Sequence, residues 1–170
     1  LQDNGAKMRQ NGQWFDVSGG DAMIVHILPS NDSIQSAARP YGEVWGTVDM
    51  WNNSGNITES IGLKGAWVTP YQPDPIIDTL FYVAYNNLYT SDNSGVSWDV
   101  LSNFNVGNLT TLSVSPADNQ TILTGNDTIL YLTRDRGATW TDITAGLPES
   151  SVVIKSVQTS HRDPLRYWVT

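Results

Sequence analysis

The sequence contains no cysteine, which excludes disulfide bonds and thiolate metal sites. Basic residues are scarce: nine Lys and Arg stand against 17 Asp and Glu, so the formal net charge is −8. Without a basic cluster to neutralise phosphates, nucleic acid is not an expected partner. Apolar runs are short, and none approaches the ~20 residues of a membrane span. The two histidines, His26 and His161, are too few for a transition-metal site, so we predict no metal and no cofactor.

Turn-forming and aromatic residues are plentiful, with 14 Gly, 8 Pro, seven Trp and seven Tyr. Apolar and polar residues alternate in short runs such as Thr111-Leu112-Ser113-Val114-Ser115. Alternation with a period of two is typical of strands, and the chain shows no apolar stripe of helical period. The sequence therefore predicts an all-β protein.

An internal repeat has a register of 42 residues. The segment 91–98, SDNSGVSW, aligns with 133–140, TRDRGATW, and every equivalent pair is 42 residues apart. The runs before and after these segments align in the same register. A β-rich repeat of this length is typical of a four-stranded propeller blade.

We therefore predict a β-propeller of four-stranded antiparallel blades, ~42–45 residues each. Blades are expected at 21–62, 65–102 and 109–147, with partial blades at 1–18 and 152–170. The chain is expected to be a segment of a larger propeller. The alternative is a four-bladed ring in which the two partial blades join.

The repeated octapeptide has the chemistry of a tight turn. Asp or Asn accepts backbone N–H bonds, Gly supplies a positive φ, hydroxyls cap neighbouring groups, and Trp packs beneath the turn. We predict a structural role for these residues: Ser91, Asn93, Gly95, Ser97, Trp98, Thr133, Asp135, Gly137, Thr139 and Trp140.

These octapeptides resemble the Asp-box of BNR repeats, with Asn93 in the Asp place of the first. Gln2-Asp3-Asn4-Gly5 with Gly19-Gly20-Asp21 is similar to a segment of exported bacterial propellers of the sortilin and sialidase type, although Ala22 replaces an expected Gly. The resemblance implies a secreted or cell-surface protein whose Asp-boxes lie away from the ligand face. A third box has decayed to Thr47-Val48-Asp49, so an irregular tip is expected at 51–56.

In a propeller, the turns between second and third strands share one face with the links between blades. Polar and aromatic groups there suit hydrogen-bonded, stacked recognition of carbohydrate or peptide; ordinary turn chemistry is the alternative explanation. The candidate ligand face consists of Gln2, Asp3, Asn4, Asp21, Arg39, Tyr41 and Tyr85.

We predict a binding or scaffold segment that recognises a protein or glycan, working with the rest of its parent polypeptide or with neighbouring subunits. The alternative is part of a glycoside hydrolase or sialidase-like enzyme completed by other blades. A sialidase needs an arginine cluster to grip a carboxylate, but Arg134 and Arg136 lie in a box and Arg39 alone lies on the face. No catalytic residue is assigned, and His26 is expected to be a core residue.

Overall fold

The computed structural model describes residues 3–147 and 153–170, so Gln2 of the candidate ligand face lies outside the described residues. Within these described residues almost all regular structure is strand, and the helices are three short 3-10 turns at Pro40–Gly42 (η1), Glu59–Ile61 (η2) and Thr144–Gly146 (η3). The all-β prediction is therefore confirmed.

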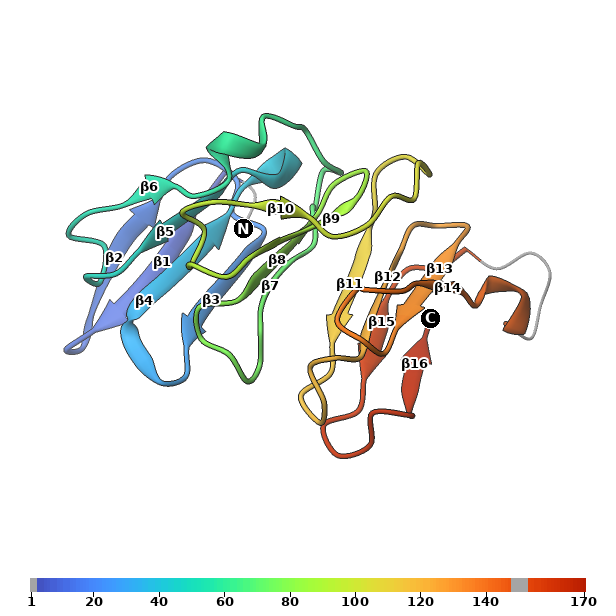
Figure 1. Cartoon of the computed structure of the whole chain (residues 1–170). Coiled ribbons are helices and arrows are strands. Elements are labelled where there is room, and N and C mark those ends of the chain that lie inside the picture. The colour runs from blue at the N-terminus through green and yellow to red at the C-terminus, as the bar shows by residue number, and fades with distance from the viewer. Residues whose placement is uncertain (1–2, 148–152) are drawn as a thin grey trace.

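In the part of the chain that the structure describes, the strands form three four-stranded and two two-stranded antiparallel sheets, which follow one another in chain order (Figure 1). The N-terminal hairpin consists of β1 (Ala6–Gln10) and β2 (Gln13–Ser18). Sheet I consists of β3 (Ile24–Leu28), β4 (Asn31–Ala38), β5 (Val44–Thr47) and β6 (Gly55–Asn56). Sheet II consists of β7 (Tyr71–Pro73), β8 (Phe81–Ala84), β9 (Leu88–Ser91) and β10 (Asp99–Val100). Sheet III consists of β11 (Thr111–Val114), β12 (Ile122–Gly125), β13 (Leu130–Thr133) and β14 (Thr141–Asp142), and the last pair is β15 (Val157–Thr159) with β16 (Tyr167–Val169).

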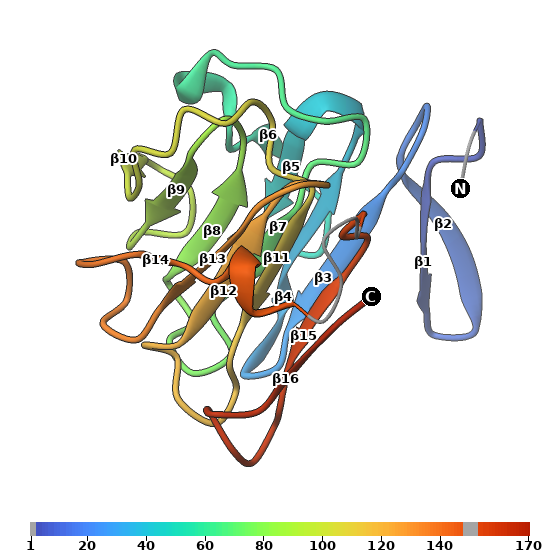
Figure 2. The same cartoon turned by 90° about the vertical axis from the view of Figure 1, so that its right-hand side faces the viewer.

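The sheets stand face to face. Within each four-stranded sheet the strands are ordered as in the chain, and the first strand of each sheet contacts the first strand of the next: β3 with β7, β7 with β11, and β11 with β15. Figure 2 shows hairpin β1–β2 beside sheet I, on the side away from sheet II. The first strands therefore line one common edge of the stack.

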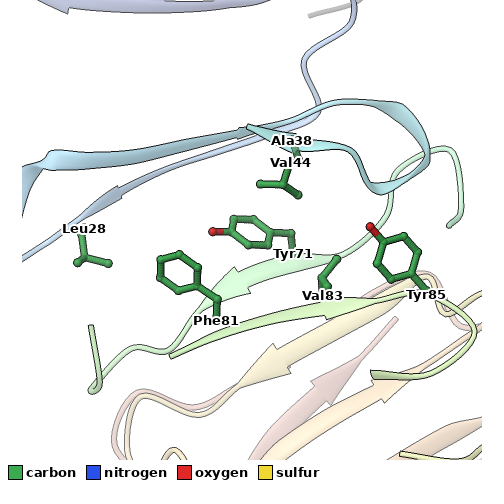
Figure 3. Close-up of a cluster of buried hydrophobic side chains, with 7 residues drawn as sticks. All are labelled: Leu28, Ala38, Val44, Tyr71, Phe81, Val83 and Tyr85. Carbon is green, nitrogen blue, oxygen red and sulfur yellow. The ribbon is translucent and has the colours of Figure 1, made fainter. Parts of the chain in front are cut away.

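The core lies between successive sheets, and β8 shows how the sequence builds it. Phe81 and Val83 pack towards sheet I, as Figure 3 shows, whereas Tyr82 and Ala84 pack towards sheet III. Both faces of the strand are thus covered, which is why its sequence is uninterrupted hydrophobic rather than alternating. The same alternation of faces places one hydrophobic layer in each gap between sheets.

The turn at 133–140 is closed by side chains bonded to the backbone. Thr133 Oγ1 donates to Asp135 Oδ1 at 2.6 Å and accepts from the amide of Gly137 at 2.9 Å. Asp135 Oδ1 also accepts the amide of Thr139 at 2.8 Å. Gly137 has φ +87°, the left-handed conformation that glycine adopts without strain. The turn at 91–98 has the equivalent bonds, with Gly95 at φ +89°.

Each of these turns also contacts the preceding sheet. The indole of Trp98 donates to the carbonyl of Ile57 at 2.7 Å, and that of Trp140 donates to the carbonyl of Leu101 at 3.3 Å. A Cβ on Gly137 would lie 2.6 Å from Leu101, so this glycine is required for packing as well as for its φ. The two Trp side chains, half-buried, bridge between sheets rather than only packing beneath their own turns.

The turn at 47–53 corrects the expectation of an irregular tip at 51–56. Thr47 Oγ1 donates to Asp49 Oδ1 at 2.9 Å and accepts from the amide of Trp51 at 3.0 Å, while Asp49 Oδ1 accepts the amide of Asn53 at 2.8 Å. These are the bonds of the other two turns. Trp51, at φ +67°, occupies the place of the glycine, and β6 follows at once. The turn persists because the hydroxyl and the carboxylate, not the glycine, make its hydrogen bonds.

Candidate functional site

The face opposite these three turns carries the β4–β5 connection, which holds two residues of the candidate ligand face. Arg39 and Tyr41 lie here, beside the link that leads from sheet I to sheet II. Arg39 Nε donates to Ser18 Oγ at 3.0 Å, which ties this connection to the end of hairpin β1–β2. This bond brings the β4–β5 connection next to the end of β2; the grouping of Asp3, Asn4 and Asp21 with Arg39 and Tyr41 on one ligand face stays a prediction.

The N-terminal acids have a local structural role. The amide of Asp3 donates to Asp21 Oδ1 at 2.6 Å, and the amide of Gly5 donates to the carbonyl of Gly20 at 2.7 Å. Asp3 has φ +59° and Asn4 follows it in the same turn. One oxygen of Asp21 is thus engaged in holding the turn that contains Asp3.

Tyr85 does not belong to the accessible face. It is 2% exposed, and its hydroxyl donates to the carbonyl of Gly42 at 2.6 Å. A Cβ on Gly42 would lie 2.6 Å from the Tyr85 ring, so the two residues are closely packed. Tyr85 directly follows β8, and its ring belongs to the core cluster between sheets I and II, so it is not available as an exposed ligand contact.

Tyr41 is held in an unusual conformation and remains exposed. It has φ +64°, its amide donates to the carbonyl of Trp67 at 3.3 Å, and its carbonyl accepts the amide of Gly65 at 2.9 Å. The rings of Tyr41 and Trp67 lie 5.3 Å apart at 88°, with 47% and 48% of the two residues exposed. A strained backbone that other bonds hold in place is typical of functional positions.

Four neighbouring side chains, from the β4–β5 connection, β5 and the sheet I–II link, are joined to one another or to Tyr41. Arg39 Nη1 lies 3.2 Å from Glu43 Oε1, and the indole of Trp45 donates to the same oxygen. The guanidinium carbon of Arg39 lies 5.0 Å from the centre of the Trp45 ring, within range of a cation–π interaction. Lys64 Nζ lies 6.0 Å from the centre of the Tyr41 ring. We call the group Arg39, Tyr41, Glu43, Lys64 and Trp67 the Tyr41 site.

A pocket of about 340 Å³ opens beside Tyr41. Its lining residues carry two carboxylates, an ammonium group, an amide and three hydroxyls, and most of them belong to the β4–β5 connection and the sheet I–II link. The lining residues are Pro40, Tyr41, Gly42, Glu43, Asn56, Thr58, Glu59, Gly62, Leu63, Lys64 and Tyr85. The site thus combines an exposed aromatic pair with an adjoining polar pocket.

Sequence reasoning missed Trp67, Lys64, Glu43 and Glu59. Trp67 stands in a link rich in Gly, outside any strand pattern, and that isolation was the available signal. Its position beside Tyr41 depends on the path of the link between two sheets, which no local pattern encodes.

A second pocket, of about 510 Å³, lies between sheets I and II on the side of the hydrogen-bonded turns. His26 contributes to it, with Nε2 3.2 Å from the carbonyl of Tyr71. Burial lowers the pKa of His26, and the hydrogen bond to Tyr71 opposes this shift. The apolar part of the wall includes Leu28, Ile34, Val48, Ile57, Phe81 and Val96.

Within residues 3–147 and 153–170, His, Cys, Asp and Glu side chains do not gather in groups of three or more that would suit a metal ion. Nor does this part of the chain contain a helix of sufficient length and hydrophobicity to cross a membrane.

Solved structures resemble this chain in fold. An ancestral GH74 enzyme matches 87% of it over 22% of its own length, with a TM-score of 0.66 and 13% identity. An auxiliary nutrient binding protein from Bacteroides thetaiotaomicron matches 88% of it over 35% of its own length, with a TM-score of 0.62 and 8% identity. YCF48 bound to D1 peptide matches 94% of this chain over 53% of its own length, with a TM-score of 0.60 and 13% identity. No protein-family model and no curated protein matches the sequence.

These likenesses, at such low identity, show the fold alone. They define the chain as a β-propeller segment with four-stranded antiparallel blades, which confirms the predicted fold class. The chain spans between 22% and 53% of the length of these three structures, which fits a segment of a larger propeller.

Proposed function

We propose that this chain is a binding or scaffold segment of a secreted or cell-surface propeller, and that the Tyr41 site recognises its protein or glycan ligand. The observation that carries the proposal is the Tyr41–Trp67 pair, two aromatic residues that are about half exposed in a loop fixed by hydrogen bonds. Exposed aromatic side chains with convergent polar groups are the usual composition of a binding site.

Two further observations support the finer assignment to Asp-box propellers. The turns at 91–98 and 133–140 contain the hydroxyl–carboxylate or hydroxyl–amide bonds that the motif requires. The turn at 47–53 repeats them. A nutrient binding protein and a protein bound to a peptide are among the structures of similar fold, which is consistent with ligand recognition. The location outside the cell rests on the resemblance to exported propellers.

The alternative, part of a glycoside hydrolase, rests on Glu43 and Glu59, which line the same pocket. Most glycosidases use two carboxyl groups, one of them protonated. Glu43, however, accepts hydrogen bonds from the guanidinium of Arg39 and from the indole of Trp45 at the same oxygen, Oε1, so this oxygen is already engaged within the protein. Structures of GH74 enzymes share the fold, but the engagement of Glu43 Oε1 by two neighbouring side chains favours a role in shaping a binding site over a catalytic one.

The test is a binding screen with the purified chain against immobilised glycans and peptides. We expect a ligand whose binding is weakened by Trp67→Ala and by Tyr41→Asn, because asparagine tolerates a positive φ but lacks the ring. The same glycans are incubated with the chain and assayed for released reducing ends. Turnover that Glu43→Gln or Glu59→Gln abolishes would overturn the binding proposal in favour of the enzyme.

A further inference from the structure

We infer that the ligand of the Tyr41 site is a neutral glycan, with a sugar ring stacked in the corner between Tyr41 and Trp67 and its hydroxyls bonded in the adjoining pocket. This inference rests on the proposed function and names its ligand class.

The geometry of the two rings fits a pyranose. They stand at 88° with centroids 5.3 Å apart, so they form a corner rather than a flat stack. A pyranose has an apolar face of C–H groups and a polar rim of hydroxyls. Its C–H face can cover one exposed aromatic ring while its edge rests on the other, which removes apolar surface from water without burying the rim.

The adjoining pocket supplies what the rim of hydroxyls needs. A hydroxyl both donates and accepts hydrogen bonds. Glu43 and Glu59 are acceptors, and Lys64 and the Nδ2 of Asn56 are donors; Asn56 Oδ1 already accepts from the amide and the hydroxyl of Thr58. A wall with acceptors and donors in the same small volume matches a polyhydroxylated ligand better than an apolar one.

The charges favour a neutral ligand. Arg39, the guanidinium of the site, is already paired with Glu43 at 3.2 Å. Lys64 and Arg39 balance the two carboxylates, Glu43 and Glu59, so the site as a whole offers no net positive charge. The chain carries a net charge of −8, which repels anions at longer range. A sialic acid or a uronic acid would meet carboxylates without a free arginine to bind it.

The backbone of the site disfavours an extended peptide. Peptides that add to a sheet edge bind through main-chain hydrogen bonds. At Tyr41 both the amide and the carbonyl are bonded within the protein, to Trp67 and Gly65. Recognition at Tyr41 therefore proceeds through side chains, and the fixed loop lowers the entropic cost of binding.

The experiment is a titration of the whole chain with neutral oligosaccharides of glucose, xylose, mannose and galactose, followed by calorimetry and by tryptophan fluorescence. Sialyllactose and polygalacturonate serve as anionic probes, and an array of linear peptides serves as the protein probe. We expect at least one neutral oligosaccharide to bind. Trp67→Ala and Tyr41→Asn should each weaken it about tenfold, the size of one lost aromatic contact, and Trp67→Phe should weaken it less.

The matched control is Trp14→Ala, because Trp14 is 69% exposed but lies in hairpin β1–β2 outside the site. It should leave the affinity unchanged, and circular dichroism should show all variants folded. Binding of a neutral glycan that Trp67→Ala does not weaken overturns the proposed site as well as the inference. Binding of an anionic glycan or a peptide alone, weakened by Trp67→Ala, overturns the inference and leaves the proposed function in place. Absence of binding to every probe overturns both.

Discussion

Asp135 is the residue whose ionisation is most closely tied to a turn. Hydrogen bonds from the hydroxyls of Thr133 and Thr139 and from the amide of Thr139 lower the pKa of its carboxyl from 3.8 to about 2. The equivalent residue in sheet II is Asn93, whose amide oxygen accepts from Ser91 and Ser97 and whose nitrogen donates to Ser97 Oγ at 2.8 Å. The same turn thus forms with a titrating side chain or with a neutral one.

This pair predicts an acid-dependent contribution to stability. Because folding lowers the pKa of Asp135, its contribution is complete above about pH 4 and is lost as the pH falls towards 2. The Asp135→Asn variant should fold, as the Asn93 turn does, and should lose less stability between pH 6 and pH 3 than the parent chain. Urea unfolding at the two pH values measures the difference. Asp49 contributes its own pH dependence in both proteins, since the side-chain amide of Asn53 lowers the pKa of its carboxyl. If the parent chain and the variant lose equal stability between the two pH values, the assignment to Asp135 is wrong.

Gly137 gives a second prediction at this scale. The backbone at Gly137 has φ +87°, and a Cβ added there would lie 2.6 Å from Leu101, which follows the last strand of the preceding sheet. Gly137→Ala should therefore lower the free energy of unfolding by about 2–4 kcal/mol, through backbone strain and overpacking together. The control is Gly146→Ala, where an added Cβ meets no atom within 4 Å. Urea midpoints that shift equally in the two variants would show that the close packing on Leu101 is unimportant.

At the scale of elements, the Trp that ends the 91–98 turn and the Trp that ends the 133–140 turn each join their sheet to the preceding one. Trp140→Phe keeps a ring but removes the N–H that donates to the carbonyl of Leu101, so it should cost about 1 kcal/mol. Trp140→Ala also removes a half-buried ring and should cost about 3 kcal/mol. Denaturant unfolding ranks the two variants. The exposed Trp168, changed to Ala, is the control and should shift the midpoint little; equal effects of Phe and Ala at position 140 would exclude a packing role.

Much of the strand and turn structure was predictable from the sequence, because the turn chemistry and the 42-residue register are local patterns. The 47–53 turn was not, since glycine was expected where Trp51 stands. Trp51 accepts its positive φ because its side chain packs in the cluster that joins sheet I to hairpin β1–β2, and its indole donates to Gln35 Oε1 at 2.8 Å. The Tyr41–Trp67 pair was also out of reach, since it joins a turn of sheet I to a link whose path depends on tertiary packing.

At the scale of the whole molecule, the loops at the two ends of the strands have different roles. The 47–53 turn follows the end of β5, whereas the β4–β5 connection that carries Tyr41 precedes its start, so they lie at opposite ends of that strand. The hydrogen-bonded turns and their Trp residues join the sheets on one side. On the other side the loops are held by Tyr85 and Gly42 and leave Tyr41 accessible. Substitutions in the turns are therefore expected to change stability without altering the Tyr41 site.

A series of side-chain hydrogen bonds joins sheet II to sheet III, and we can predict what its loss does to stability. Asp74, which is buried, accepts at Oδ1 from the side-chain amide of Asn119 at 2.8 Å, and Asn119 Oδ1 accepts from Arg136 Nη2 at 2.6 Å. Asn119→Ala removes both bonds and leaves a buried carboxylate with one donor fewer. It should cost about 1–3 kcal/mol, because the lost hydrogen bond leaves part of the lost hydration of Asp74 uncompensated, although the amides of Ile76 and Ile77 still donate to this carboxylate. Asn108→Ala, an exposed site, is the control for unfolding by urea. If Asn119→Ala unfolds at the midpoint of that control, the Asp74–Asn119–Arg136 bonds contribute nothing to the joining of the two sheets.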